Sequence, residues 1–203
     1  HEYNKVEKAK QLTALLLEGK NIALITDAGT PAISDPGEVL VRMCREREIT
    51  VTSLPGPAAC ITALTLSGLS TRRFCFEGFL PADKKERRAV LEELKEESRT
   101  MVLYEAPHHL VHTLEELFEV LGDRKLAVCR ELTKRYETVV STTLSGALAH
   151  YRENAPRGEY VLVLEGRSLA HKREEEIAQW QSMSIEEHMS FYLTKGMERK
   201  EAM

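Results

Sequence analysis

The sequence lacks the features that mark several functional classes. No apolar run approaches the roughly 18 residues that a bilayer-spanning helix needs, and no signal-peptide pattern opens the chain. The four cysteines form no CxxC pair, and together with the seven histidines they show no metal-ligand spacing. We therefore expect a cytoplasmic protein with buried, reduced thiols, no bound metal and no membrane partner.

The usual phosphate-binding loops are also missing. Neither GxxxxGKS/T nor GxGxxG occurs in the chain, which argues against nucleoside triphosphates and NAD as ligands. The net charge of −4 argues against a wholly basic nucleic-acid binder, although a local basic face stays possible. With 203 residues, the chain has the size of one large globular domain or two small ones.

The first third of the chain alternates between helical and strand patterns. Apolar spacing and turn residues predict helices at 5–18, 35–48 and 55–69, with short β-branched strands at 21–26 and 49–54. This order is typical of a parallel α/β sheet, here of the Rossmann-like kind.

The second part is richer in strands and predicts a further α/β domain with a mixed sheet. We expect three regions: a cofactor-binding domain at 1–72, the second domain at 73–168, and a charged helical segment at 169–203. Strands are predicted at 73–81, 100–106, 125–132, 137–144 and 159–166, and helices at 83–97, 108–121 and 145–153.

The loop after the first predicted strand contains two glycines and two prolines within the stretch LITDAGTPAISDPG, residues 24–37. Ligands of parallel sheets bind beyond the carboxyl ends of the strands, where this loop and the one at 55–58 both lie. The 27–33 stretch holds no lysine or arginine, which suits a cationic or zwitterionic ligand held by backbone groups. A tight structural turn is the alternative.

Six ordered motifs resemble the tetrapyrrole methylase superfamily, and more narrowly the ribosomal RNA small-subunit methyltransferase I family. The similarity extends over residues 1–166. The motifs are DAGTPAISDPG, LPGPAACITAL, FCFEGFLP, LYEAPHHL, CRELTKRYET and GEYVLVLEG.

The resemblance implies two α/β domains with S-adenosylmethionine in the cleft between them. It also implies a homodimer that methylates a ribose 2′-oxygen of a cytidine in the decoding region of 16S rRNA, within the small ribosomal subunit. The positions that match the cofactor-binding motifs are Asp27, Ala28, Gly29, Thr30, Pro31, Ile33, Pro55, Gly56, Pro57, Ala58, Ala59, Tyr104 and Ala106.

One departure from the family pattern concerns the start of the first domain. The family begins with a strand and a loop reading approximately GTPIGNL, and this sequence does not contain them. The GMERKEAM stretch likewise resembles only the start of a terminal helical motif. We expect a first domain without its first strand, and a poor or inactive catalyst.

A ribose hydroxyl needs a group that takes its proton before it can attack a methyl donor. The candidate catalytic residues are Glu105, Glu131 and Lys134, with Asp27 as a further possible base. Each has an ordinary alternative: a strand-end carboxylate, a salt bridge, a surface lysine or a turn former.

A basic segment provides candidate contacts with RNA phosphates. Between positions 72 and 88, six basic residues stand against three acidic ones. A solvated helix face is the alternative. The candidate RNA-binding residues are Arg72, Arg73, Lys84, Lys85, Arg87 and Arg88.

Three functional hypotheses follow from these observations. The first is an rRNA 2′-O-methyltransferase, which the basic segment favours. The second is a precorrin-type C-methyltransferase of the wider superfamily, and the third is a non-catalytic dimerising or RNA-binding module.

Overall fold

The computed structural model describes residues 4–168 and 184. The helical segment predicted at 169–203 lies outside these residues, apart from Ser184. The helices are α1 (Lys5–Leu17), α2 (Gly37–Glu46), α3 (Ala59–Leu66), α4 (Lys84–Glu96), α5 (Leu110–Leu121) and α6 (Leu144–Glu153). The strands are β1 (Phe74–Gly78), β2 (Thr100–Glu105), β3 (Lys125–Arg130), β4 (Thr138–Thr143) and β5 (Tyr160–Leu164).

The strands form one mixed sheet in the order β1-β2-β5-β3-β4. β1 and β2 are parallel, and the other neighbours are antiparallel. Side chains alternate along β2, so that Met101 and Leu103 join a core with α4, α5 and α6, while Val102 and Tyr104 face α3. The α/β class and the mixed sheet are confirmed.

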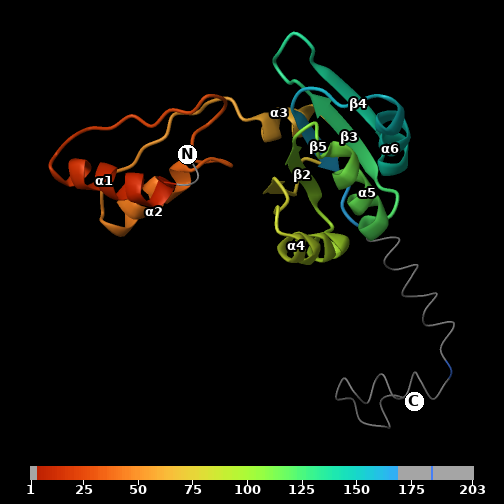
Figure 1. The fold of residues 1–203 in the computed structure, drawn as a ribbon, viewed down its shortest axis with the longest axis horizontal. Coiled ribbons are helices and arrows are strands. Elements are labelled where there is room, and N and C mark those ends of the chain that lie inside the picture. The colour runs from red at the N-terminus through yellow and green to blue at the C-terminus, as the bar shows by residue number, and fades with distance from the viewer. Residues whose placement is uncertain (1–3, 169–183, 185–203) are drawn as a thin grey trace.

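Helix α3 covers part of the second face of the sheet (Figure 1). Its buried side chains, Cys60, Ala63 and Leu64, have the i, i+3, i+4 spacing of one helix face. They pack against residues of β2, β3 and β5. The end of the region 1–72 therefore packs on strands of the region 73–168, and the division at these boundaries stays a prediction.

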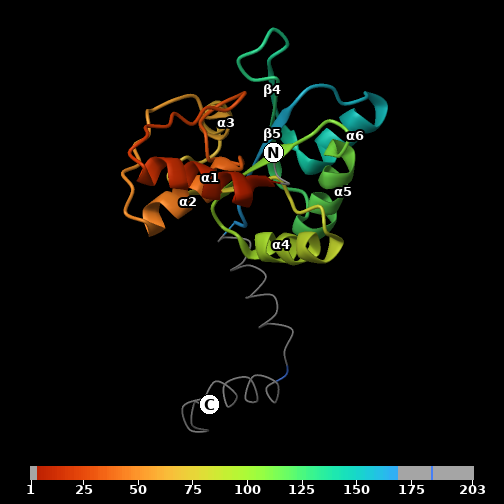
Figure 2. The ribbon, with the colours of Figure 1, turned by 60° about the vertical axis from the view of Figure 1, so that its left-hand side comes forward.

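Helices α1 and α2 pack against each other around a small core of their own. Ala9 on α1 and Val39, Leu40, Met43 and Cys44 on α2 are its buried members. In Figure 1 this pair stands apart from the sheet, and irregular chain connects the two. Figure 2 shows the same pair after rotation, with α3 above it in the view.

The two strands predicted at 21–26 and 49–54 are wrong for the described structure, which has irregular chain there. A strand is held by ladder hydrogen bonds to a neighbour, and no backbone hydrogen bond between these two segments occurs within residues 4–168. Ile49 and Val51 pack against the small core of α1 and α2, whereas Ile25 and Leu54 are open to solvent, at 84% and 83% exposed. The described sheet therefore belongs to residues 74–164 alone.

Smaller differences concern the helix starts and one cysteine. The helices predicted at 35–48 and 55–69 begin at Gly37 and Ala59, because the preceding residues form loops. Cys44, Cys60 and Cys129 are buried as expected, whereas Cys75 is half-buried near the edge of the sheet at β1.

Candidate functional site

The loops at 27–33 and 55–59 come together, as the sequence predicts. The Thr30 hydroxyl Oγ1 donates a hydrogen bond to the Pro57 carbonyl oxygen at 2.9 Å. A Cβ atom on Gly29 would lie 3.5 Å from the same oxygen, and one on Gly56 would lie 3.5 Å from Thr30 Oγ1. The two glycines therefore lie where the loops meet, with little side chain between them.

Left-handed backbone gives the first loop its shape. Gly29, Ala32 and Ser34 have φ angles of 73°, 67° and 52°. The Asp35 carboxylate accepts hydrogen bonds from the backbone N–H groups of Gly37 at 2.7 Å and Ala32 at 3.2 Å. This carboxylate ties the end of the loop to the first turn of α2, which explains the concentration of turn-forming residues there.

We expect Asp35→Asn to destabilise the α1–α2 pair at neutral pH and to have no effect in strong acid. Burial raises the pKa of Asp35, but the hydrogen bonds from Gly37 and Ala32 outweigh it, so the net pKa lies below its usual value. A lowered folded-state pKa stabilises above the unfolded pKa of about 4 and loses that contribution as pH falls through the folded value. Hydrogen exchange in α2 at pH 7 and pH 2 measures this, and an equal difference at both pH values would contradict it.

The loop exposes groups that a ligand can use. In the part of the chain that the structure describes, none of the backbone N–H groups of residues 27–30 donates a hydrogen bond. Asp27, Ala28 and Gly29 are exposed, and Ile33 adds an apolar side chain that is 42% exposed. Unpaired donors, one carboxylate and apolar surface therefore lie next to one another.

The end of this loop reaches the sheet at the carboxyl end of β1. A Cβ atom on Gly78, where φ is 62°, would lie 2.9 Å from the Ser34 hydroxyl. Any side chain there would be strained and crowded. Gly78 therefore allows Ser34 to approach the sheet edge, a contact that sequence reasoning missed.

Tyr104 joins the second loop to the sheet. Its hydroxyl accepts a hydrogen bond from the backbone N–H of Cys60 at 3.1 Å, immediately after residues 55–59. Phe76 and Phe79 pack edge-on against its ring, with centroids 4.9 and 5.7 Å away. Burial raises the pKa of Tyr104 to about 12, so the hydroxyl stays protonated at neutral pH. Ala106 follows as a half-buried residue just beyond β2.

Glu105 lies on the opposite face of the sheet from Tyr104. It is 5% exposed, and its Oε2 accepts a hydrogen bond from Thr113 Oγ1 at 2.5 Å. Arg87 donates to the same Thr113 oxygen at 2.7 Å and to Glu116 at 2.6 Å. This geometry favours a structural role for both Glu105 and Arg87, and their predicted catalytic and RNA-binding roles stay predictions.

Glu131 and Lys134 lie in the loop between β3 and β4. Lys134 Nζ lies 3.1 Å from Glu131 and 2.8 Å from Glu159. The backbone N–H of Glu159 and the Lys134 ammonium lower the pKa of Glu131, and the two carboxylates raise the pKa of Lys134. A carboxylate with a lowered pKa is a weaker base, so this ion pair suits a charged contact better than proton removal.

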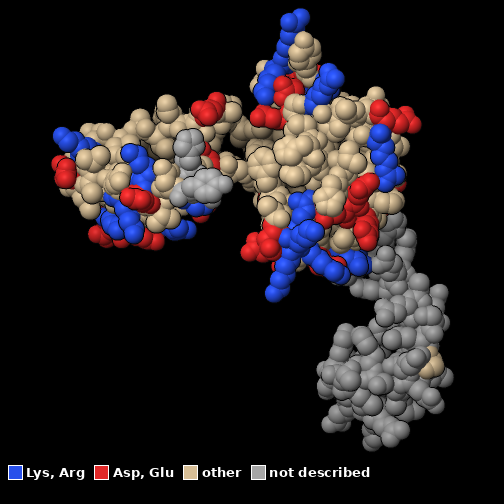
Figure 3. Space-filling model, in the orientation of Figure 1, with Lys and Arg blue, Asp and Glu red and all other residues tan. Residues whose placement is uncertain are grey.

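The exposed candidate RNA-binding residues form two groups, and the half-buried Arg87 belongs to neither. Arg72 and Arg73 are exposed just before β1, and Lys84, Lys85 and Arg88 are exposed at the start of α4. The Asp83 carboxylate caps this helix, accepting from the N–H groups of Lys85 and Glu86 at 3.0 Å each. Figure 3 shows lysine and arginine side chains gathered near α4.

Neither a bilayer span nor a metal-ligand cluster is found in the described residues. None of their helices is long and apolar enough to cross a membrane. Their histidine, cysteine, aspartate and glutamate side chains form no group of three or more that could hold a metal ion.

Comparison with known sequences gives extended matches. The sequence model of the family described as Tetrapyrrole (Corrin/Porphyrin) Methylases matches residues 1–148. A protein of Halalkalibacterium halodurans named ribosomal RNA small subunit methyltransferase I is 45% identical over all of this chain and 70% of its own length. A protein of Escherichia coli with the same name is 49% identical over 87% of this chain and 61% of its own length.

Solved structures share the fold at low sequence identity. The methyltransferase CobJ matches 81% of this chain and 74% of its own with a TM-score of 0.60 and 18% identity. A uroporphyrin-III C-methyl transferase from Thermus thermophilus, complexed with S-adenyl homocysteine, matches 78% of this chain and 73% of its own with a TM-score of 0.54 and 16% identity.

Proposed function

The chain belongs to the tetrapyrrole methylase family of methyltransferases, and from this membership we propose that it transfers a methyl group from S-adenosylmethionine to ribosomal RNA. The observation that carries the proposal is the 45% identity over the whole chain to a relative named as such a methyltransferase. The solved precorrin-4 and uroporphyrin-III methyltransferases that share the fold are 16–22% identical to this chain, well below the relatives named for ribosomal RNA, which supports RNA over a tetrapyrrole as the substrate.

The two joined loops fit S-adenosylmethionine. Its adenosine presents hydrogen-bond acceptors and an apolar ring, and its methionine part carries an ammonium group. Residues 27–30 offer free N–H donors and the Asp27 carboxylate, and Ile33 offers apolar surface. When bound, this group supplies an activated methyl. Residues 27–33, residues 55–59 and Tyr104 would hold it.

The acceptor that we propose is the 2′-hydroxyl of a cytidine in the decoding region of 16S rRNA. Displacement at a methyl carbon needs the attacking oxygen in line with the bond that breaks, so the main task of the chain is alignment. Lys134, kept charged by Glu131 and Glu159, suits contact with a phosphate or with the ribose. Asp27 is the exposed carboxylate of the cofactor loop and can accept the hydroxyl proton.

A transfer assay tests the substrate class. In the assayed chimera, residues 1–203 replace the matched segment of the H. halodurans relative. We expect it to methylate 30S subunits and not a precorrin. Transfer to the precorrin alone would support the tetrapyrrole hypothesis, and transfer to neither would favour a non-catalytic module.

We expect Lys84→Glu, Lys85→Glu and Arg88→Glu together to weaken RNA binding and to flatten its salt dependence. Each phosphate contact on single-stranded RNA contributes about 0.7 to the slope of log K against log salt, so losing three lowers the slope by about 2. Fluorescence anisotropy with a labelled oligonucleotide measures it. The matched control changes Lys8, Lys10 and Lys20, three exposed lysines elsewhere, to glutamate. Equal slopes for the two triple variants would show that α4 faces away from RNA.

We further propose a cytoplasmic homodimer that acts on the small ribosomal subunit. The resemblance to the family supports this assembly, and soluble oligomers are most often twofold pairs. Light scattering that gives the mass of a single chain at all concentrations would contradict it for residues 1–203.

A further inference from the structure

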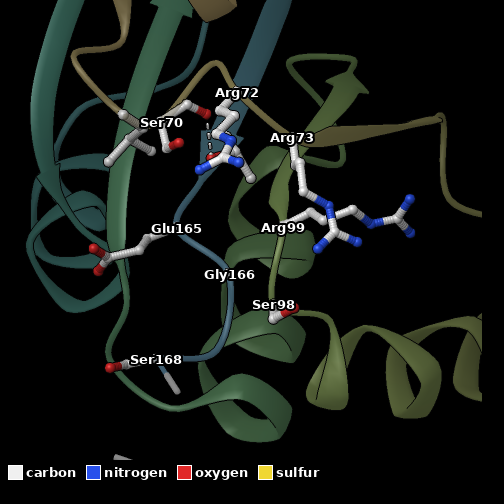
Figure 4. Close-up of a pocket in the computed structure, with 10 residues that line it drawn as sticks. Ser70, Arg72, Arg73, Ser98, Arg99, Glu165, Gly166 and Ser168 are labelled. Carbon is white, nitrogen blue, oxygen red and sulfur yellow. Dashed lines mark hydrogen bonds between the residues drawn. The ribbon is translucent and has the colours of Figure 1, made fainter. Parts of the chain in front are cut away.

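A pocket lies at the end of the sheet that is farther from Tyr104. It opens beside the amino ends of β1 and β2, and its lining includes Ser70, Arg72, Arg73, Ser98, Arg99 and Glu165 (Figure 4). Tyr104 and Ala106 lie at the other end of β2, a strand of six residues and so about 20 Å long. The pocket is therefore distinct from the paired cofactor loops.

The parallel pairing of β1 and β2 places two arginines next to each other. Phe74 pairs with Thr100, so the residues just before them, Arg73 and Arg99, flank the same edge. The N–H of Thr100 donates to the Arg73 carbonyl at 3.3 Å, and its hydroxyl donates to the Ser70 carbonyl at 2.7 Å, the bond dashed in Figure 4. These bonds fix the segment that carries Arg72 and Arg73.

The pocket has an excess of positive charge. Arg99 forms a two-pronged pair with Glu97, at 2.9 and 2.5 Å, and Glu165 pairs with Lys125 at 3.3 Å. Arg72 and Arg73 form no ion pair with any residue in the described ranges. Arg72 and Arg73 therefore bring two guanidinium groups without an acidic partner in the described ranges to the lining of the pocket, and both attract a bound anion.

We propose that this pocket binds a phosphodiester group of the RNA, at a distance from the methylated ribose. The inference rests on the proposed function and adds a second anchor to it. Guanidinium groups match the geometry of phosphate oxygens, and the hydroxyls of Ser70 and Ser98 add further donors. An anchor so far from the reacting atoms positions the RNA and takes no part in the chemistry, so its loss raises KM and leaves kcat unchanged.

The test compares RNA binding by the 203-residue chain and by Arg72→Gln/Arg73→Gln. A labelled single-stranded oligonucleotide with the decoding-region sequence is titrated at several salt concentrations. Loss of two phosphate contacts should lower the slope of log K against log salt by about 1.4. The charge-matched control, Lys8→Gln/Lys10→Gln, should keep the wild-type slope, and Arg72→Lys/Arg73→Lys should keep most of it.

Two kinds of result would overturn the proposal. One is an equal slope for wild type and Arg72→Gln/Arg73→Gln, or no RNA binding by the wild type. The other is a combination of two results: inorganic phosphate binds the wild type and not Arg72→Gln/Arg73→Gln in calorimetry, and both proteins bind RNA equally well. That combination would indicate a site for a small anion. Methyl transfer by the chimera is measured separately, so a failed pocket and a failed function give different results.

Discussion

Gly29→Val is expected to reduce S-adenosylmethionine binding by about 100-fold, to below detection in calorimetry. The φ angle of 73° at Gly29 is one that a β-branched residue adopts only under strain, of about 1–3 kcal/mol. The first added carbon would lie in ordinary van der Waals contact with the Pro57 carbonyl, at 3.5 Å, so that the branched methyl groups beyond it have to fit where the two loops meet. Both effects displace the N–H groups of residues 27–30 from the ligand.

Gly19→Val is the matched control for this variant. Gly19 also has a left-handed backbone, with φ of 85°, but a Cβ atom there meets nothing within 4 Å. It follows α1 and lies outside both loops. We expect this variant to lose stability and to bind S-adenosylmethionine as the wild type does. Unchanged binding by Gly29→Val would remove the cofactor-loop assignment.

Thr113→Val is expected to lower the free energy of unfolding by about 1–3 kcal/mol, because it removes one of the two hydrogen bonds that the buried Glu105 carboxylate accepts, the other coming from the Ala106 N–H. Thr113 is 1% exposed, and its hydroxyl is the donor to Glu105 Oε2. Valine has nearly the same shape, so the change removes the hydrogen bond and opens no cavity. Arg87 also loses the oxygen to which its Nη2 donates. Urea unfolding followed by circular dichroism measures the effect.

The exposed Thr65 on α3 provides the comparison for Thr113. Its hydroxyl donates to the Thr62 carbonyl at 2.9 Å, in an exposed setting where water replaces the lost partner. We expect Thr65→Val to change stability by less than about 0.5 kcal/mol. Equal losses of unfolding free energy in the two variants would show that the buried bond to Glu105 contributes no more to stability than the exposed bond of Thr65.

The sequence predicts the strands and helices of the sheet region well because their patterns are local. Apolar spacing at Leu110, Leu114, Leu117 and Leu121 defines α5, and all four side chains are buried in the core. The strands predicted at 21–26 and 49–54 fail for a different reason. Their composition favours strand, but a ladder needs a hydrogen-bonded neighbour, which a pattern within one segment cannot reveal.

The site was easier to predict where glycine and proline mark a loop in the local sequence than where segments distant in the sequence meet. Glycine and proline mark both loops, and the expected approach of the two loops is seen in the hydrogen bond from Thr30 to Pro57. The bond from Thr113 to Glu105 was missed, although a threonine within the apolar face of a predicted helix was an available signal. The placement of Arg73 near Arg99 follows from the register of β1 and β2, in which Phe74 pairs with Thr100, and separate sequence segments do not fix that register.

The poor catalysis expected from the sequence stays a prediction, and the structure offers a physical reason for it. The segments that lead into both cofactor loops, 21–26 and 49–54, form no strand ladder in the described structure. Loops without a rigid base hold a ligand less well aligned, and small misplacements can cost about 100-fold in rate. We therefore expect the 203-residue chain to turn over more slowly than the chimera.

The most direct test of the central claim is the position of the methyl group on the RNA. The chimera is incubated with 30S subunits and S-adenosylmethionine labelled in the methyl group, and the RNA is then hydrolysed in alkali. Alkaline cleavage needs a free 2′-hydroxyl, so a 2′-O-methylated cytidine survives in a labelled dinucleotide. We predict label in one cytidine-containing dinucleotide from the decoding region, and its loss in the Gly29→Val chimera. Label on a base, on a different RNA, or unchanged by Gly29→Val would contradict the account.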